Sequence, residues 1–159
     1  MGKNEGKGGE SMQDRFEAFT LLIAGINRSI RRIKTEEMAE FDLKSPHVSC
    51  LYYLYKEGAL TLKALGDICD EDKAALSRSI DHLEKRGYVT MSNKKGMRYK
   101  AEISLSETGR EVAGKVVRKI DGFLKDVGVS LGEEGRAALY SGLRTVNRDL
   151  EKICEKYDK

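Results

Sequence analysis

Apolar residues near the start of the chain recur every three or four positions. This first stripe consists of Phe16, Phe19, Ile23, Ile26, Ile30 and Ile33. A second stripe with the same repeat lies near the other end and consists of Leu139, Leu143, Val146, Leu150, Ile153 and Tyr157. Another precedes it, at Val112, Val116, Ile120, Phe123 and Val127. Because this repeat places side chains on one face of an α-helix, the pattern predicts long amphipathic helices at both ends of the chain.

The stripes at the two ends are longer than a small centre can cover. Ser130 and Glu133 precede the last helix with the spacing of a capping box, so we expect that helix to begin there. Amphipathic helices of this length need an apolar partner surface, which a second copy of the chain would supply. We therefore expect a homodimer. Its interface would contain Phe16, Phe19, Ile23, Leu139, Leu143, Val146, Leu150 and Ile153.

The middle of the chain predicts a series of short helices. The first has Ser45 as its N-cap, Pro46 at the first helical position and Gly58 as its stop. Thr61 caps the next helix and Asp72 caps the one after it. The inner faces consist of Leu62, Leu65 and Ile68 in the second helix and of Leu76, Ile80 and Leu83 in the third.

A β-hairpin follows these helices. Val89 and Met91 alternate with polar neighbours, residues 93–98 form a loop, and Ala101, Ile103 and Leu105 alternate again. Helix, turn, helix and hairpin in this order predict a winged helix-turn-helix. The predicted fold class is therefore mainly α with a small β-hairpin wing, with long N- and C-terminal dimerisation helices.

The length of 159 residues is that of about one domain. We expect residues 1–12 to be a flexible tail and residues 13–159 to form a single domain. Within it, residues 45–107 would form the winged lobe, and 14–40 and 108–157 the dimerisation helices.

Positive charge is concentrated in the winged lobe. The chain as a whole carries +3, whereas residues 73–100 hold eight basic and two acidic residues, a local charge of +6. In a winged helix-turn-helix the second helix of the pair enters the DNA major groove, and the wing reaches the backbone or the minor groove. Arg78 could pair with guanine, and cations of the wing loop with phosphates. The candidate DNA-binding residues are Lys73, Ala74, Ser77, Arg78, Asp81, Lys94, Lys95 and Arg98.

Acidic residues crowd the start of the same helix. They are Asp67, Asp70, Glu71 and Asp72, and carboxylates repel phosphates. Asp72 is explained as a cap. The others could face away from DNA, hold neighbouring cations or weaken non-specific binding. The alternative function is therefore a winged-helix protein-interaction module that has lost specific DNA binding.

Three segments of this lobe carry a resemblance to a known family. They are residues 62–65, 72–89 and 105–109, with the run Asp72-Lys73, Ser77-Arg78 and Leu83-Glu-Lys-Arg-Gly87 the most specific. They resemble the multiple antibiotic resistance regulator (MarR) family of bacterial and archaeal transcription factors, over residues 14 to 156. In the wing, the family commonly has Asp-x-Arg, of which Gly96-Met97-Arg98 keeps only the arginine.

The resemblance implies a triangular homodimer whose terminal helices form the interface and whose winged lobes bind a pseudo-palindromic operator. It also implies a repressor that a small effector, often anionic and aromatic, releases from DNA. The candidate effector-binding residues are Arg28, His47, Tyr52 and Tyr55. Packing of the tyrosines in the helical core is the alternative.

Nothing in the sequence indicates an enzyme. His47 and His82 stand apart from any catalytic or metal-binding motif, so we expect no catalytic residue, no metal and no cofactor. Cys50, Cys69 and Cys154 have neither disulfide-framework nor zinc-finger spacing. We expect packing or incidental thiols and a reducing, cytoplasmic location. The expected partners are double-stranded DNA, a second copy of the chain and a small aromatic or anionic effector, but no membrane.

Overall fold

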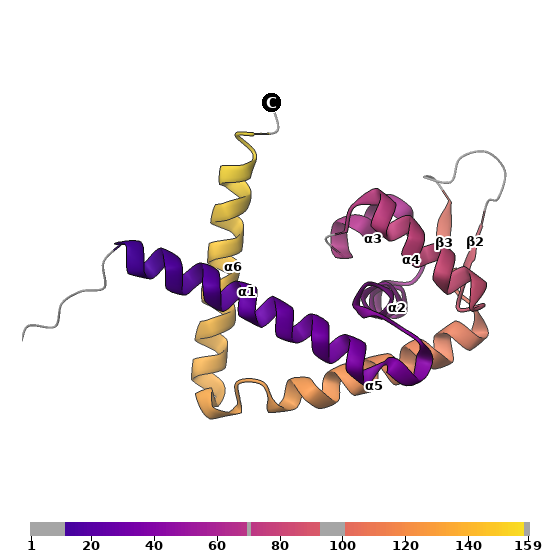
Figure 1. Ribbon diagram of the computed structural model, residues 1–159, viewed down its shortest axis with the longest axis horizontal. Coiled ribbons are helices and arrows are strands. Elements are labelled where there is room, and N and C mark those ends of the chain that lie inside the picture. The colour runs from indigo at the N-terminus through magenta and orange to yellow at the C-terminus, as the bar shows by residue number, and fades with distance from the viewer. Residues whose placement is uncertain (1–11, 70, 93–100, 158–159) are drawn as a thin grey trace, which may run out of the picture. The chain divides into compact units, whose positions relative to one another are not determined.

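The computed structural model describes residues 12–69, 71–92 and 101–157. Its helices are α1 (Met12–Glu37), α2 (Ser45–Glu57), α3 (Leu62–Cys69), α4 (Lys73–Lys85), α5 (Glu107–Asp126) and α6 (Gly132–Cys154), as Figure 1 shows. The strands are β1 (Leu60–Thr61), β2 (Val89–Met91) and β3 (Glu102–Leu105), and short 3-10 helices are η1 (Ala39–Phe41) and η3 (Val129–Leu131). This order confirms the predicted winged helix-turn-helix between long terminal helices. The predicted wing-loop residues Lys94, Lys95 and Arg98 lie outside the described residues, as does Asp70.

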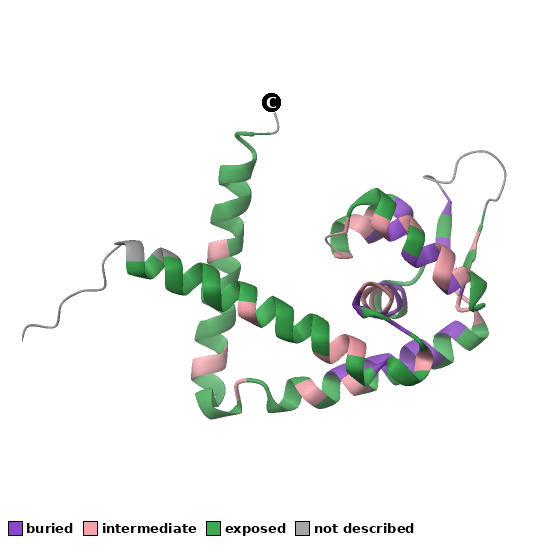
Figure 2. Ribbon diagram, in the orientation of Figure 1, coloured by how far each residue is buried: buried purple, intermediate pink, exposed green. Residues whose placement is uncertain are grey.

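The chain divides into two compact units, one up to Val117 and one from Arg118 onward. In the first unit α2 packs against α1, α3, α4 and β3. Figure 2 shows buried residues on α2, on α4 and on the first part of α5. The fully buried side chains include Leu51, Leu65, Leu76, Ile80, Leu83 and Ile103.

One prediction about this core is wrong, namely that Ile68 lies on the buried face of α3. Ile68, in the last turn of α3, is 40% exposed. The next residue, Cys69, is half-buried, and the other two members of the predicted inner face, Leu62 and Leu65, are buried. The last turn of α3 therefore lies at the edge of the core.

The wing is part of a three-stranded antiparallel sheet with the order β1-β3-β2. Val89 pairs with Leu105 and Met91 with Ile103, which confirms the predicted hairpin. The sheet also contains β1, where Leu60 pairs with Ile103. A strand of two residues is too short to show a period of two in the sequence, so only an extended segment could be expected there.

The structure confirms some of the helix caps predicted from the sequence, but not all of them. Thr61 Oγ1 accepts a hydrogen bond from the Ala64 amide at 3.2 Å, which confirms that cap. Ser45, however, is not the N-cap of α2, because Lys44 occupies that position. The Ser45 amide donates to Thr35 Oγ1 at 3.2 Å instead. The imidazole Nδ1 of His47 accepts a hydrogen bond from the Lys44 amide at 3.1 Å and so completes the first turn.

The capping box predicted for the last helix is also wrong. Ser130 lies inside η3, and α6 begins two residues later at Gly132 with no side-chain cap. Gly128 and Gly132 have φ angles of 71° and 66°, a backbone region that glycine enters more easily than other residues. These two glycines shift the helix start away from the position that Ser130 and Glu133 would need.

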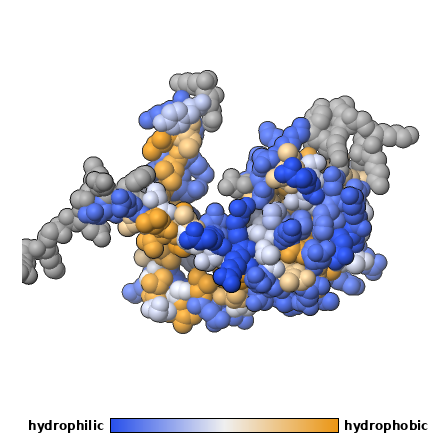
Figure 3. All heavy atoms as spheres, viewed as in Figure 1, coloured by the Kyte–Doolittle hydropathy of each residue, from blue (hydrophilic) through white to orange (hydrophobic). Residues whose placement is uncertain are grey.

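Apolar side chains remain exposed on α1 and α6. On α1 they are Phe19, Leu21, Leu22, Ile23, Ile26 and Ile30, and on α6 they are Leu139, Tyr140, Leu143, Leu150 and Ile153. Figure 3 shows hydrophobic residues gathered on the terminal helices and mainly hydrophilic ones on the winged lobe. Val146 is half-buried, and the side chain of Phe16 lies outside what the structure describes. Within the described ranges, no helix combines the length and apolarity needed to cross a membrane.

Candidate nucleic-acid interface

Helix α4 begins with a complete side-chain cap. Asp72 Oδ1 accepts hydrogen bonds from the amides of Ala74 and Ala75, each at 2.8 Å. These bonds, that from Ala75 above all, hold the pKa of the Asp72 carboxyl below its usual value, and the charge of Arg78 acts in the same direction. The predicted cap is thus confirmed. The negative charge of the Asp72 carboxylate interacts favourably with the partial positive charge of the amides in the first turn of α4.

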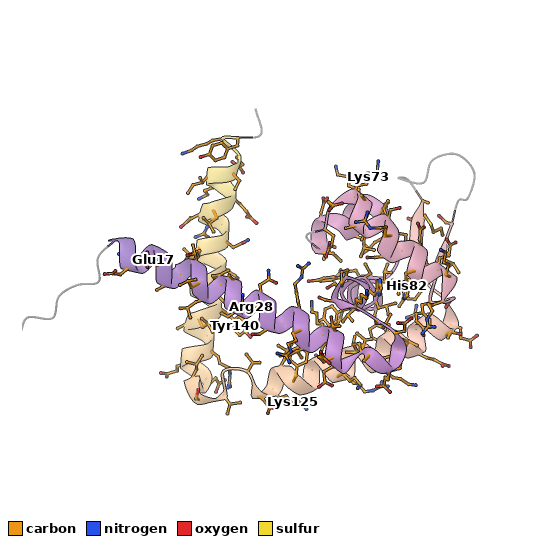
Figure 4. The ribbon with its side chains drawn as sticks, in the orientation of Figure 1. Glu17, Arg28, Lys73, His82, Lys125 and Tyr140 are labelled. Atoms are coloured by element: carbon orange, nitrogen blue, oxygen red, sulfur yellow. The ribbon has the colours of Figure 1, made fainter. Side chains whose placement is uncertain are left out.

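The core fixes which side of α4 faces outward. Leu76, Ile80 and Leu83 are buried, and Ser79 Oγ turns back to donate to the Ala75 carbonyl. The remaining side of the helix start carries the predicted DNA-contacting residues. Lys73, Ala74 and Arg78 are exposed, and Ser77 and Asp81 are half-buried. Figure 4 shows Lys73 projecting outward at the start of α4.

The acidic turn before α4 is partly neutralised from within the chain. Glu71 pairs with Arg31 of α1 at 3.4 Å, and its side chain is only 15% exposed. This is one of the alternatives that the sequence left open, namely that an acidic residue of the turn holds a neighbouring cation. The carboxylate at Glu71 is therefore paired.

A cavity of about 620 Å³ lies between α3 and α4. Its lining consists of Thr61, Leu62, Lys63, Gly66, Asp67, Glu71, Lys73 and Leu76. None of the four predicted effector-binding residues is among them.

The four predicted effector-binding residues differ in exposure and in the residues that they contact. Arg28 is exposed on α1, and Tyr55 is 38% exposed on α2. Tyr52 is half-buried and packs edge-on against its neighbour Tyr53 at a centroid distance of 5.3 Å. His47 is half-buried and lies against His82 of α4.

A pair of stacked histidines joins α2 to α4. The rings of His47 and His82 are 4.2 Å apart and within 6° of parallel. Burial, followed by the proximity of His82, lowers the pKa of His47 to about 4. His82 Nε2 lies 3.2 Å from the carbonyl oxygen of Asp42. Both histidines thus take part in orienting α4, a role that their distance along the sequence does not indicate.

Two further positioning residues were missed by the sequence reasoning. Arg86, just after α4, donates a hydrogen bond to the Phe41 carbonyl at 3.0 Å and lies 3.9 Å from the Asp42 carboxylate. Ser106 Oγ donates to the Gly87 carbonyl and accepts from the Gly109 amide at 2.9 Å. The first set of contacts ties α4 to η1, and the second ties the α4–β2 turn to α5.

Comparison with known proteins gives a consistent result. Residues 41–94 match the family model described as "MarR family". The chain is 29% identical over 118 residues to the uncharacterized HTH-type transcriptional regulator YfiV of Bacillus subtilis, with 72% of each chain covered.

Many solved structures have a similar fold, among them two regulators. The MarR family regulator NMB1585 of Neisseria meningitidis has a TM-score of 0.70 at 22% identity, covering 92% of this chain and 99% of its own. MepR of Staphylococcus aureus in complex with DNA has a TM-score of 0.73 at 16% identity, covering 83% of this chain and 97% of its own. Residues 41–94 of the chain therefore match the MarR family model, and the chain shares the fold of the solved MarR family regulator NMB1585 over 92% of its length.

Proposed function

We propose that the protein is a homodimeric repressor that binds a pseudo-palindromic DNA operator and leaves it when a small aromatic or anionic effector binds. The observation that carries this proposal is the capped start of α4, whose outward side presents Lys73, Ala74 and Arg78 while its other side is buried. MepR, a protein of similar fold, has been solved in complex with DNA, which supports the same use of this fold here.

Each residue of this side has a chemical role in the proposal. The planar guanidinium of Arg78 would pair with O6 and N7 of a guanine, and the methyl group of Ala74 would pack on a thymine methyl. Lys73 and Ser77 would contact phosphates or base edges, beside Asp81. In the wing loop, Lys94, Lys95 and Arg98 would reach phosphates or the minor groove.

The exposed stripes of α1 and α6 support the dimer. Ile26 is 54% exposed and Leu150 is 48% exposed, and each lies in a row of apolar neighbours. Soluble proteins rarely expose large contiguous apolar patches, and such patches commonly mark interaction sites. A dimer through these stripes would place two α4 helices about 34 Å apart, one turn of B-DNA, which is the spacing of a pseudo-palindromic site.

The effector step needs a ligand that prefers one arrangement of the two winged lobes. A compound bound near Arg28, Tyr52 and Tyr55 would release DNA only if it favoured a spacing that the operator does not fit. His47 would then act through its stack with His82 of α4.

Selection from random duplex DNA tests the proposal. The full-length protein is used to enrich bound duplexes, and the most enriched one is titrated at two salt concentrations. We expect an inverted repeat with half-sites about one helical turn apart, and an affinity that falls steeply with salt. Recovery of no preferred sequence by a folded dimer would overturn the proposal in favour of a protein-interaction module.

A further inference from the structure

Helix α4 is attached at both ends to one continuous segment of the chain. This α1–η1 segment, residues 12–42, consists of α1, η1 and the residues that join and end them. At the start of α4, Arg31 of α1 lies 3.4 Å from the carboxylate of Glu71, in the turn just before the helix. At the end of α4, Arg86 donates a hydrogen bond at 3.0 Å to the Phe41 carbonyl of η1. Because the two attachments are a helix length apart, together they restrain the direction of α4 as well as its position.

The attachment at the end of α4 is made to a backbone that the core holds in place. Met38 and Leu43, on either side of η1, are buried. Between them, the Asp42 carbonyl oxygen lies 3.2 Å from His82 Nε2, and the Asp42 carboxylate lies 3.9 Å from Arg86. His82 and Arg86 therefore hold the end of α4 against a fixed part of the α1–η1 segment.

The attachment at the start of α4 depends on one ion pair. The Glu71 side chain is 15% exposed, and that of Arg31 is 59% exposed. The Glu71 amide donates to the Gly66 carbonyl of α3 at 3.2 Å, so the backbone that carries this carboxylate is itself held, one residue before the Asp72 cap. An ion pair with an exposed partner contributes little to the free energy of unfolding, and its removal should therefore leave the fold intact.

We propose that Arg31, Glu71 and Arg86 are positioning residues for operator recognition, which fix the direction in which α4 presents Arg78 to DNA. This inference rests on the proposed function. The pairing of a guanidinium with two atoms of one guanine depends on direction, whereas attraction to phosphates tolerates small displacements. Loss of either attachment therefore reduces the discrimination between the operator and other duplexes more than it reduces non-specific binding.

The test measures, with full-length protein, the ratio of affinities for the selected operator and for a scrambled duplex. We expect Glu71→Gln and Arg86→Met each to lower this ratio about two- to five-fold, the range that an ion pair of this exposure contributes. Charge alone predicts a different result for Glu71→Gln, because removing a carboxylate near phosphates strengthens binding to every duplex and leaves the ratio unchanged. Asp67→Asn and Lys85→Met are the matched controls, since they remove the same charges at nearby exposed positions, and both should keep the wild-type ratio.

A double substitution tests whether Arg31 and Glu71 act through each other. Arg31→Gln should lower the ratio as Glu71→Gln does, and the double variant should lose no more than either single variant. An unfolded fraction of the protein reduces both affinities by the same factor, so a loss of stability alone does not change the ratio.

Wild-type ratios in Glu71→Gln and Arg86→Met would overturn the inference while the selected operator still supported the proposed function. Losses that added up fully in the double variant would overturn the role of the ion pair. Failure of the wild-type protein to select any operator would instead overturn the proposed function, and this inference with it.

Discussion

Gly109 is the residue whose substitution the structure restricts most directly. A Cβ atom at this position would overlap the Tyr88 carbonyl oxygen, which already accepts the Ser106 amide at 3.0 Å. We expect Gly109→Ala to lower the free energy of unfolding by roughly 2–4 kcal/mol, because backbone must move to relieve the overlap. Urea denaturation measures this. The matched control is Gly122→Ala on α5, where an added Cβ meets no atom within 4 Å; it should be neutral or slightly stabilising.

If Gly109→Ala were as stable as the Gly122→Ala control, the close approach of α5 to Tyr88 would be wrong. The same close contact between α5 and Tyr88 gives both Ser106 and Gly109 a structural role. Ser106 Oγ accepts the Gly109 amide, and the missing side chain at Gly109 leaves room for the Tyr88 carbonyl.

His47 makes stability depend on pH in the acid range. Its pKa is about 4 in the folded chain, below its ordinary value of 6.5, so the unfolded chain binds the proton more tightly. Stability is therefore complete above pH 6.5 and is lost as the pH falls from there toward 4. Solvent reaches part of this imidazole, so we expect a loss of about 1 kcal/mol rather than the roughly 3 kcal/mol of a fully buried group.

Urea denaturation of wild type and His47→Gln at pH 7 and pH 4.5 checks this. The two proteins differ only at residue 47, so the difference between their changes in stability from pH 7 to pH 4.5 reports on the His47 imidazole. Equal slopes in the two proteins would contradict the burial of His47 against His82.

At the scale of elements, the caps of α3 and α4 were predictable because they are local. Thr61 and Asp72 each bond an amide two or three residues ahead, a spacing that the sequence displays. The stack of His47 on His82 was not predictable, since it depends on how α2 crosses α4. The prediction of a capping box at Ser130 and Glu133 was wrong for a related reason. The backbone conformations of the glycines on either side of η3 determine where α6 begins.

The Asp72 cap leads to a prediction for α4. Removing its side chain in Asp72→Ala leaves the Ala74 and Ala75 amides without their acceptor, so we expect the free energy of unfolding to fall. Asp72→Ser keeps an oxygen that can accept at the same place, so most of that loss should be restored. Thermal or urea denaturation of the two variants decides the point. Equal destabilisation by alanine and serine would show that the carboxylate charge, not the cap, is what matters.

At the scale of the whole molecule, the exposed stripes require a second chain in our account. Leu143 is 40% exposed in the middle of the α6 stripe, and a carboxylate there would be buried in the proposed interface. We expect Leu143→Glu to be monomeric at micromolar concentration, while wild type is dimeric. Sedimentation equilibrium measures this. Arg148→Glu is the control, because Arg148 is exposed and outside the apolar stripe. A dimeric Leu143→Glu protein would place the interface elsewhere.

The sequence could predict which residues of α4 face outward but not which of them contact DNA. Helical periodicity with one buried face determines the exposure of Lys73 and Arg78. In the proposed complex, the base or phosphate that each residue would contact depends on how two copies of the chain are placed on a duplex. The packing within one chain determines only part of that placement.

Arg78 provides the most direct test of the account. The ratio of affinities for the selected operator and for a scrambled duplex is measured at one salt concentration for wild type, Arg78→Ala and Arg148→Ala. We predict that Arg78→Ala loses about 1–3 kcal/mol of discrimination, the usual worth of a bidentate guanine contact. Arg148→Ala, on α6, should keep the wild-type ratio. Unchanged discrimination in Arg78→Ala would contradict the claim that this helix reads the operator.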